Sequence, residues 1–179
     1  MLKTTYRAAA GAFITFAVGM QYWLLVPLIA AESSAGRFLS RPSVRTAVTG
    51  YIIIVGVVYY LLLAGLSQRQ GWPMFYEYML HYVTPPLFVL DWLLFVPKGE
   101  IGWRNGIGSL AFPLVYLGWT LAHGAYDGWY PYPFLDVLEL GYGRVLLNTA
   151  RLILAFLALE LLLVAIDRMI RQNRSKTSI

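Results

Sequence analysis

Long apolar runs are the feature that most constrains how this chain folds. Several stretches approach or exceed the roughly 20 residues that a helix needs to cross the hydrocarbon core of a bilayer. The clearest one lies within residues 47–66 and carries no charged side chain. Backbone polar groups in lipid must be hydrogen-bonded within the segment itself, which favours helices. Together with a hydrophobic content of 59%, these runs predict an all-α, polytopic membrane helix bundle.

We expect about five transmembrane helices in a single domain. The predicted spans are residues 8–30, 47–66, 75–96, 107–123 and 145–166. The aromatic segment 125–143 is rich in turn-forming residues and suits an interfacial cap better than a sixth span. Residues 167–179 form a basic tail. The first apolar run follows a basic start, as in a signal peptide, but it is longer than a usual signal core and is interpreted as a retained span.

The charge and the cysteine content exclude several classes of function. Few residues lie outside the predicted spans, so there is no room for a nucleotide-binding or DNA-reading domain. The net charge of +5 is therefore interpreted as a topology signal and not as affinity for nucleic acid. The chain has no cysteine, which excludes disulfides, thiol catalysis and cysteine-based metal sites. No metal or other cofactor is expected.

The distribution of basic residues predicts the orientation in the membrane. Nine basic residues would lie on one side: Arg37, Arg41, Arg45, Lys98, Arg104, Arg168, Arg171, Arg174 and Lys176. Four would lie on the other side: Lys3, Arg7, Arg69 and Arg144. The side with more Lys and Arg is usually cytoplasmic. We therefore expect an integral protein of a bacterial cytoplasmic membrane, with its amino terminus outside and its carboxyl terminus inside.

The third predicted span is unusual because it contains ionisable residues. Such groups are costly in a membrane, and they usually face a protein interior or a water-filled cavity and serve function. Glu77 and His81 are four residues apart, so they share one face of a helix and the carboxylate can orient the imidazole of a general base. Alternatively, Glu77 lies at the wet interface and stabilises the helix start. Pro85 and Pro86 should kink the helix next to His81.

Polar residues in other spans are predicted to reach the same outer layer of the membrane. From the helical rise, Thr15, His81 and Arg151 each lie about 10 Å from the outer end of their span. Asn148 lies one turn nearer the surface. His123 is at the outer mouth of the fourth span, and Asp136 lies above it in the cap. Because an arginine pointing to lipid is expensive, we expect Arg151 to face an interior pocket.

Two acidic residues lie near the inner ends of their spans and are not expected in this pocket. Asp91 anchors the inner interface or pairs with Arg45, Arg104 or Arg168 in this interpretation. Glu160 in the fifth span lies at a comparable inner depth, and its role stays open.

Several motifs in a fixed order resemble the Pr-six-Pr family of small bacterial membrane proteins. They are LHYVTPPLFVLDWLLFVPKG, FPLVYLGWT, GWYPYPFLDV and GYGRVLLN, and the resemblance covers roughly residues 41–168. That family is distantly similar to the androgen-induced transmembrane hydrolases, which use a threonine and a histidine to cleave fatty acid esters of hydroxy fatty acids. By this resemblance, His81 matches the histidine of an H-x-x-x-P pattern, and Thr15 is the candidate for the nucleophilic threonine. The family usually has six spans and a Ser/Thr-Asn pair after the threonine, where this chain has Val18 and Gly19.

The resemblance implies an intramembrane hydrolase of lipid esters. His81 would accept the proton of Thr15, and Arg151 or Asn148 would stabilise the oxyanion. The alternative is a non-enzymatic protein that binds a lipid or transports a small solute through the same pocket, although the chain lacks the internal symmetry of many transporters. A further alternative is haem ligation by His81 and His123.

Overall fold

The computed structural model describes residues 33–66 and 70–177, with side chains up to residue 173. Thr15 and the predicted span 8–30 lie outside the described residues. Within them there is no strand, which confirms the all-α fold. The helices in chain order are α3 (Ser34–Leu39), α4 (Pro42–Val58), α5 (Trp72–Tyr78), α6 (Thr84–Phe95), α7 (Trp103–Gly108), α8 (Ala111–Asp127) and α9 (Val137–Thr177).

Two of the long helical rods contain a turn of π-helix. The rod that begins with α4 continues through the π-helical turn η2 (Tyr59–Leu63) and the 3-10 turn η3 (Ala64–Leu66). The rod that begins with α5 passes through the π-helical turn η4 (Met79–Val83) into α6. A short 3-10 turn, η5 (Pro133–Leu135), lies in the cap before α9. Since π-helical turns are rare and often occur at functional sites, these two turns draw attention to one end of the bundle.

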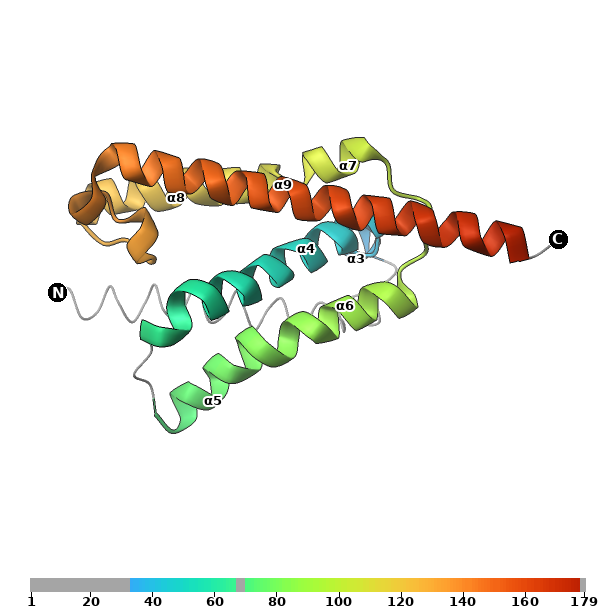
Figure 1. Ribbon diagram of the computed structural model, residues 1–179, viewed down its shortest axis with the longest axis horizontal. Coiled ribbons are helices and arrows are strands. Elements are labelled where there is room, and N and C mark those ends of the chain that lie inside the picture. The colour runs from blue at the N-terminus through green and yellow to red at the C-terminus, as the bar shows by residue number, and fades with distance from the viewer. Residues whose placement is uncertain (1–32, 67–69, 178–179) are drawn as a thin grey trace.

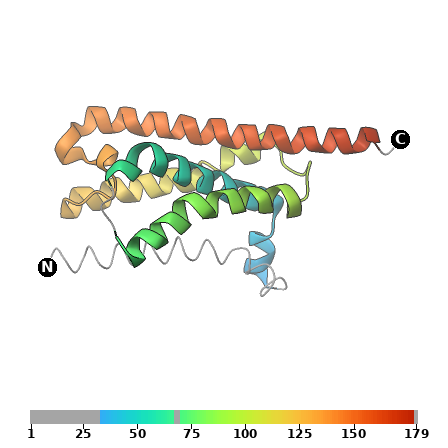
Figure 2. The same ribbon diagram turned by 60° about the horizontal axis from the view of Figure 1, so that its bottom comes forward.

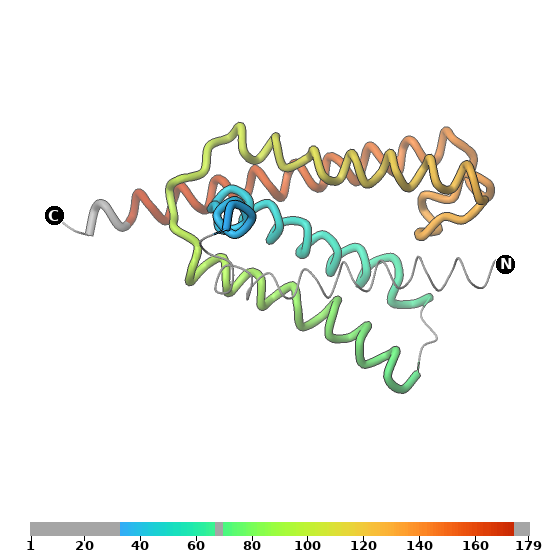
Figure 3. The backbone as a smooth tube through the Cα atoms, turned by 180° about the vertical axis from the view of Figure 1, so that it is seen from behind, coloured from blue at the N-terminus to red at the C-terminus, as the bar shows by residue number. Residues whose placement is uncertain are grey.

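Helix α4 lies between α6 on one side and the α8–α9 pair on the other (Figures 1 and 3). Helix α3, the loop after α6, α7 and the carboxyl end of α9 gather at one end of the molecule, which Figure 2 also shows. We call this the basic end, because Arg37, Arg41, Lys98 and Arg171 lie there on these elements. The opposite end holds the cap, η2 and α5. Helix α6 lies close to α9 at the basic end and diverges from it toward the opposite end.

The helices differ in their bounds from the predicted spans for local chemical reasons. The predicted span 47–66 begins earlier, at Pro42, because proline is well tolerated in the first turn of a helix. The predicted span 107–123 is divided into α7 and α8 at Ser109, whose hydroxyl donates to the Gly106 carbonyl over 2.7 Å. The predicted cap 125–143 contains the first turns of α9, which is kinked where Gly141 adopts φ 73°.

Two helices of the described residues are long and apolar enough to cross a membrane. They are Pro42–Leu66 and Val137–Asn173. Many large apolar side chains on their surfaces and on α6 are exposed, including Leu61, Leu94 and Leu154. Large contiguous apolar surfaces are unusual on proteins in water and are expected on proteins that contact lipid. These observations support a membrane protein, and the full count of five spans stays a prediction.

The buried core is concentrated toward the basic end, where three helices meet. Trp92 of α6, 1% exposed, packs with Val96 and with Leu163 of α9. Its indole nitrogen donates a hydrogen bond of 2.7 Å to the buried Thr46 hydroxyl of α4. A second cluster, along the contact between α4 and α6, joins Val48 and Ile52 of α4 to Phe88 of α6. Burial and hydrogen bonding of the large Trp92 side chain therefore tie α6 to α4 and α9 at this end.

Contacts of charged side chains join the helices at the same end of the bundle. Arg45 of α4 and Asp91 of α6 form an ion pair in which the guanidinium nitrogen lies 2.6 and 2.8 Å from the two carboxylate oxygens. Of the three arginines predicted as ion-pair partners of Asp91, Arg45 is the one that pairs with it in the structure. Further along, Asp167 accepts a hydrogen bond from the Gly99 amide over 2.8 Å, and Arg171 donates to the Gly99 carbonyl over 2.9 Å. These contacts fasten the loop after α6 to α9.

Candidate functional site

His81 lies in the π-helical turn η4 and stacks on Tyr59, the first residue of the π-helical turn η2. The two ring centroids are 3.9 Å apart and the planes are inclined by 16°. Tyr59 is only 7% exposed, so it forms a fixed surface under the imidazole. Two π-helical turns on neighbouring helices thus face each other, and each supplies one ring of the pair. This arrangement holds the imidazole plane in one orientation.

A hydrogen bond to the backbone determines which nitrogen of His81 carries the proton. Nδ1 lies 2.8 Å from the backbone carbonyl oxygen of Glu77. A carbonyl oxygen can only accept, so Nδ1 donates, and in the neutral ring Nε2 then carries the basic lone pair. This is the tautomer that a general base needs. The sequence predicted that the Glu77 carboxylate orients His81; the bond seen here uses the backbone carbonyl of Glu77, and a role for the carboxylate stays a prediction.

Proline and glycine explain why the chain adopts this local geometry. Pro85 and Pro86 lack amide hydrogens, so an α-helix cannot continue its regular bonding through the preceding turn. The helix widens there into η4, and the Thr84 hydroxyl donates to the Met79 carbonyl over 2.8 Å. On the facing helix, a Cβ at Gly56 would lie 2.7 Å from Cγ of Pro85 and 3.2 Å from the His81 carbonyl oxygen. The missing side chain at Gly56 therefore permits the close approach of α4 and α6 at His81.

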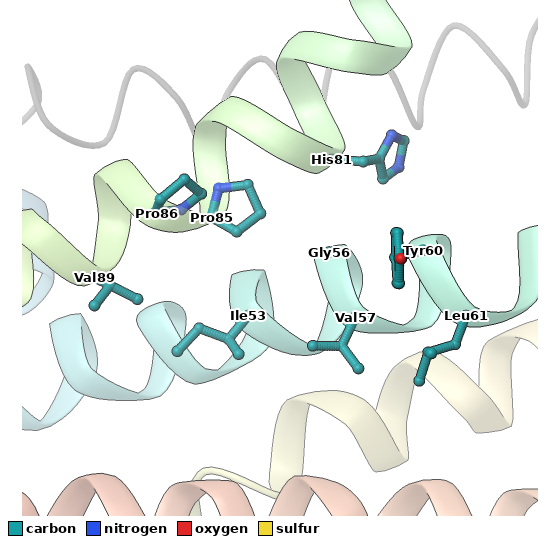
Figure 4. A pocket seen from close by; sticks show the side chains of 9 residues that line it. All are labelled: Ile53, Gly56, Val57, Tyr60, Leu61, His81, Pro85, Pro86 and Val89. Atoms are coloured by element: carbon teal, nitrogen blue, oxygen red, sulfur yellow. The ribbon is translucent and has the colours of Figure 1, made fainter. Parts of the chain in front are cut away.

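An open groove of about 350 Å³ runs along the α4–α6 junction next to His81. Figure 4 shows its lining: Ile53, Gly56, Val57, Tyr60 and Leu61 on the α4 side, and His81, Pro85, Pro86 and Val89 on the α6 side. The imidazole of His81 and the hydroxyl of Tyr60 are the polar side-chain groups among these lining residues. The groove is open along one side, and its lining is apolar apart from these two groups.

The residues predicted around the cap lie on a different pair of helices from His81. His123 Nδ1 of α8 lies 3.3 Å from Asp127, which also accepts the Trp129 amide over 3.0 Å. Asp136 accepts the amides of the first turn of α9, at 2.8 Å from Leu138. Helix α4 separates α8 and α9 from η4, so this group is distinct from the His81 groove (Figure 1).

Asn148 and Arg151 also lie away from His81. The Asn148 amide donates to the Phe134 carbonyl over 3.0 Å and thereby holds the cap against α9. Arg151 lies on an exposed part of α9 in the described structure, and not in an interior pocket as predicted. Helical periodicity places residues on a face of one helix, but it does not show which neighbour that face meets.

The cap itself is a packed element. Tyr130 packs its ring on Gly124 of α8, where a Cβ would lie 2.2 Å from the ring. Burial raises the pKa of the Tyr132 hydroxyl well above its usual value of 10.0, and the neighbouring Tyr116 adds to the rise. Tyr132 therefore stays protonated and available for hydrogen bonding over the whole physiological pH range.

A comparison with protein families identifies the chain. A model of the FAR-17a/AIG1-like proteins matches residues 61–165, which is more than half of the 179 residues. The chain belongs to the FAR-17a/AIG1-like family. No curated protein and no solved structure matches it. The narrower Pr-six-Pr resemblance stays a prediction.

The matched region of this FAR-17a/AIG1-like protein runs from η2 into α9. It includes His81, His123, Asn148 and Arg151, and it leaves out Tyr59 and Thr15. Within the described residues, no group of three or more His, Asp or Glu side chains could hold a metal ion. Sequence reasoning missed Tyr59 as part of the site. A tyrosine in an apolar helix carries no distinctive signal until the partner helix is known.

Proposed function

We propose that this FAR-17a/AIG1-like protein is an intramembrane hydrolase of lipid esters with His81 as its general base. The observation that carries the proposal is the orientation of His81. Its Nδ1 is bonded to a backbone carbonyl, its ring is stacked on Tyr59, and it borders an apolar groove. An acyl chain suits the groove, and the ester group would lie at Nε2. Membership of the family supports the reaction class only at a coarse level.

Thr15 is the proposed nucleophile. Nε2 of His81 takes the proton of the threonine hydroxyl while the threonine oxygen bonds to the ester carbonyl carbon. The carbon–oxygen bond to the alcohol then breaks, and the alcohol leaves with the proton from His81. Water repeats the sequence on the acyl-threonine, which releases the acid and restores the threonine. The Tyr60 hydroxyl belongs to the lining of the same groove as His81, so it is a further candidate, besides Asn148 and Arg151, to donate to the oxyanion.

An activity probe tests this mechanism. We expect a fluorophosphonate to label the full-length protein in detergent, and His81→Asn or Thr15→Ala to reduce the labelling rate at least about a hundredfold. Asparagine keeps a donor near the Glu77 carbonyl but has no basic nitrogen, so it separates loss of the base from loss of the fold. Leu87→Ala is the matched control, because Leu87 is 50% exposed on the same helical rod.

The outcome also decides between the hydrolase and the alternative of a lipid-binding or transport protein. If the wild type is not labelled but a fluorescent fatty acyl ester binds in a way that Ile53→Trp blocks, the groove binds lipid without chemistry. If labelling survives in Thr15→Ala, the threonine mechanism is wrong. Labelling that survives in His81→Asn contradicts the role of the histidine.

We also infer five spans, with the amino terminus outside and the carboxyl terminus inside a bacterial cytoplasmic membrane. The gathering of Arg37, Arg41, Lys98 and Arg171 at one end of the bundle supports this orientation. Alkaline phosphatase fused to the amino terminus should be active, and a fluorescent protein fused to the carboxyl terminus should fluoresce. The opposite pattern would contradict the orientation and would place His81 near the inner surface.

A further inference from the structure

A buried carboxyl group lies where α4, α7 and α9 meet, and it is not among the residues that line the His81 groove. Glu160 of α9 is only 1% exposed. A Cβ at Gly50 of α4 would lie 2.1 Å from Oε1 of Glu160, so the carboxyl group packs directly on the backbone of α4. On α7, a Cβ at Gly106 would lie 3.5 Å from the Glu160 carbonyl oxygen. Two glycines therefore bring two helices close to the same glutamate.

Within the part of the chain that the structure describes, no Lys, Arg or His forms an ion pair with Glu160, and its Oε1 accepts no hydrogen bond. Arg45 of α4 is paired with Asp91 instead. An isolated carboxylate in an apolar interior is so costly that the group takes up a proton instead.

Ser109 is a neighbour of Glu160. Its single hydroxyl proton is donated to the Gly106 carbonyl over 2.7 Å, and Ser109 is 6% exposed. While that bond is kept, the hydroxyl has no proton to donate to a charged Glu160 carboxylate.

The other titratable groups around Glu160 also favour its neutral form. Tyr51 of α4 is the titratable group that interacts electrostatically with it, and the Tyr51 hydroxyl donates to the Ser109 carbonyl. Asp167, two turns further along the same face of α9, is fully buried, and its Oδ2 accepts the Gly99 amide. A second acidic group and a neutral tyrosine give no stabilisation to a carboxylate.

We propose that Glu160 is a proton-binding site inside the bundle, separate from the His81 groove, whose carboxyl group holds a proton at neutral pH. Loss of that proton would place an uncompensated charge against the Gly50 backbone. Proton occupancy is therefore coupled to the close packing of α4 on α9. The ligand of this site is a proton, and the site does not depend on the hydrolase proposal.

Infrared spectroscopy of the full-length protein in lipid nanodiscs tests the proposal directly. At pH 7 we expect a protonated-carboxyl band above the amide region that shifts in D₂O and is missing in Glu160→Gln. Glutamine is neutral and similar in shape, so the fold should be kept. Glu139→Gln is the matched control, since Glu139 is an exposed glutamate on the same helix, and it should retain the band. Absence of the band in the wild type, or its persistence in Glu160→Gln, would overturn the proposal.

A hydrophobic carbodiimide provides a second readout that needs no variant. Dicyclohexylcarbodiimide adds to a protonated carboxyl group: the proton moves to a nitrogen of the reagent and the carboxyl oxygen bonds to its central carbon. The O-acylisourea then rearranges to a stable N-acylurea, and no other reactant is consumed. Peptide mapping of the treated wild type should find this adduct on Glu160 at pH 7. An unmodified Glu160 would count against the proposal, whatever the reactivity of the other carboxyl groups.

Discussion

Replacing Arg45 with methionine is expected to destabilise the protein by about 3 kcal/mol or more. Asp91 would keep its charge in a mostly covered position, with a side chain only 15% exposed, and would lose a guanidinium nitrogen that now lies within 2.8 Å of both its oxygens. Leaving one member of a buried pair uncompensated is the costly case, whereas replacing both members is often nearly neutral. Thermal unfolding in detergent should show a fall of about 6–12 °C for a chain of this size.

A double variant separates loss of the pair from general damage at this end. Arg45→Met combined with Asp91→Leu should regain most of the lost thermal stability, because no charge is then left unpaired. Arg41→Met is the matched control. Arg41 is exposed at the start of the same helix, and its guanidinium lies over the Phe38 ring at 5.5 Å. Its removal should therefore change the melting temperature by less than about 2 °C. A double variant as unstable as Arg45→Met would contradict the role of the ion pair.

Replacing Gly56 with leucine should damage both the fold and the candidate site. Even the first carbon of a side chain would lie 2.7 Å from Pro85 and 3.2 Å from the His81 carbonyl oxygen. Pro85 is a rigid ring on a helix, so α6 must move away from α4, and the stacking of His81 on Tyr59 is lost. Overpacking of this kind costs about 1–3 kcal/mol. We expect a lower melting temperature and at least a tenfold slower reaction with the fluorophosphonate.

Gly65→Leu is the control for this change. Gly65 lies on the same helical rod, and a Cβ there meets nothing within 4 Å. The variant should therefore keep both its melting temperature and its reaction rate. If Gly56→Leu reacted as fast as Gly65→Leu, the close approach of α4 and α6 would not be what positions His81.

The sequence by itself determined the kind of fold and the positions of the chemically unusual residues. Apolar runs of span length led to the all-α prediction, since a backbone in lipid can satisfy its polar groups only internally. His81 and the Pro85–Pro86 pair stood out because an imidazole and two prolines are rare within an apolar run.

Only the tertiary structure decided which of these residues meet. The direction of a helix face depends on how the helix rotates and packs against its neighbours, and close packing at glycines controls that rotation. For this reason, Asp91 could be paired with Arg45 only once α4 and α6 were in place. The stacking of Tyr59 on His81 also required the π-helical turn η2 on the facing rod, which contains no proline and which no residue pattern predicts. The exposure of Arg151 and the burial of Glu160 followed from the rotation of a single helix, α9, against α4 and α7.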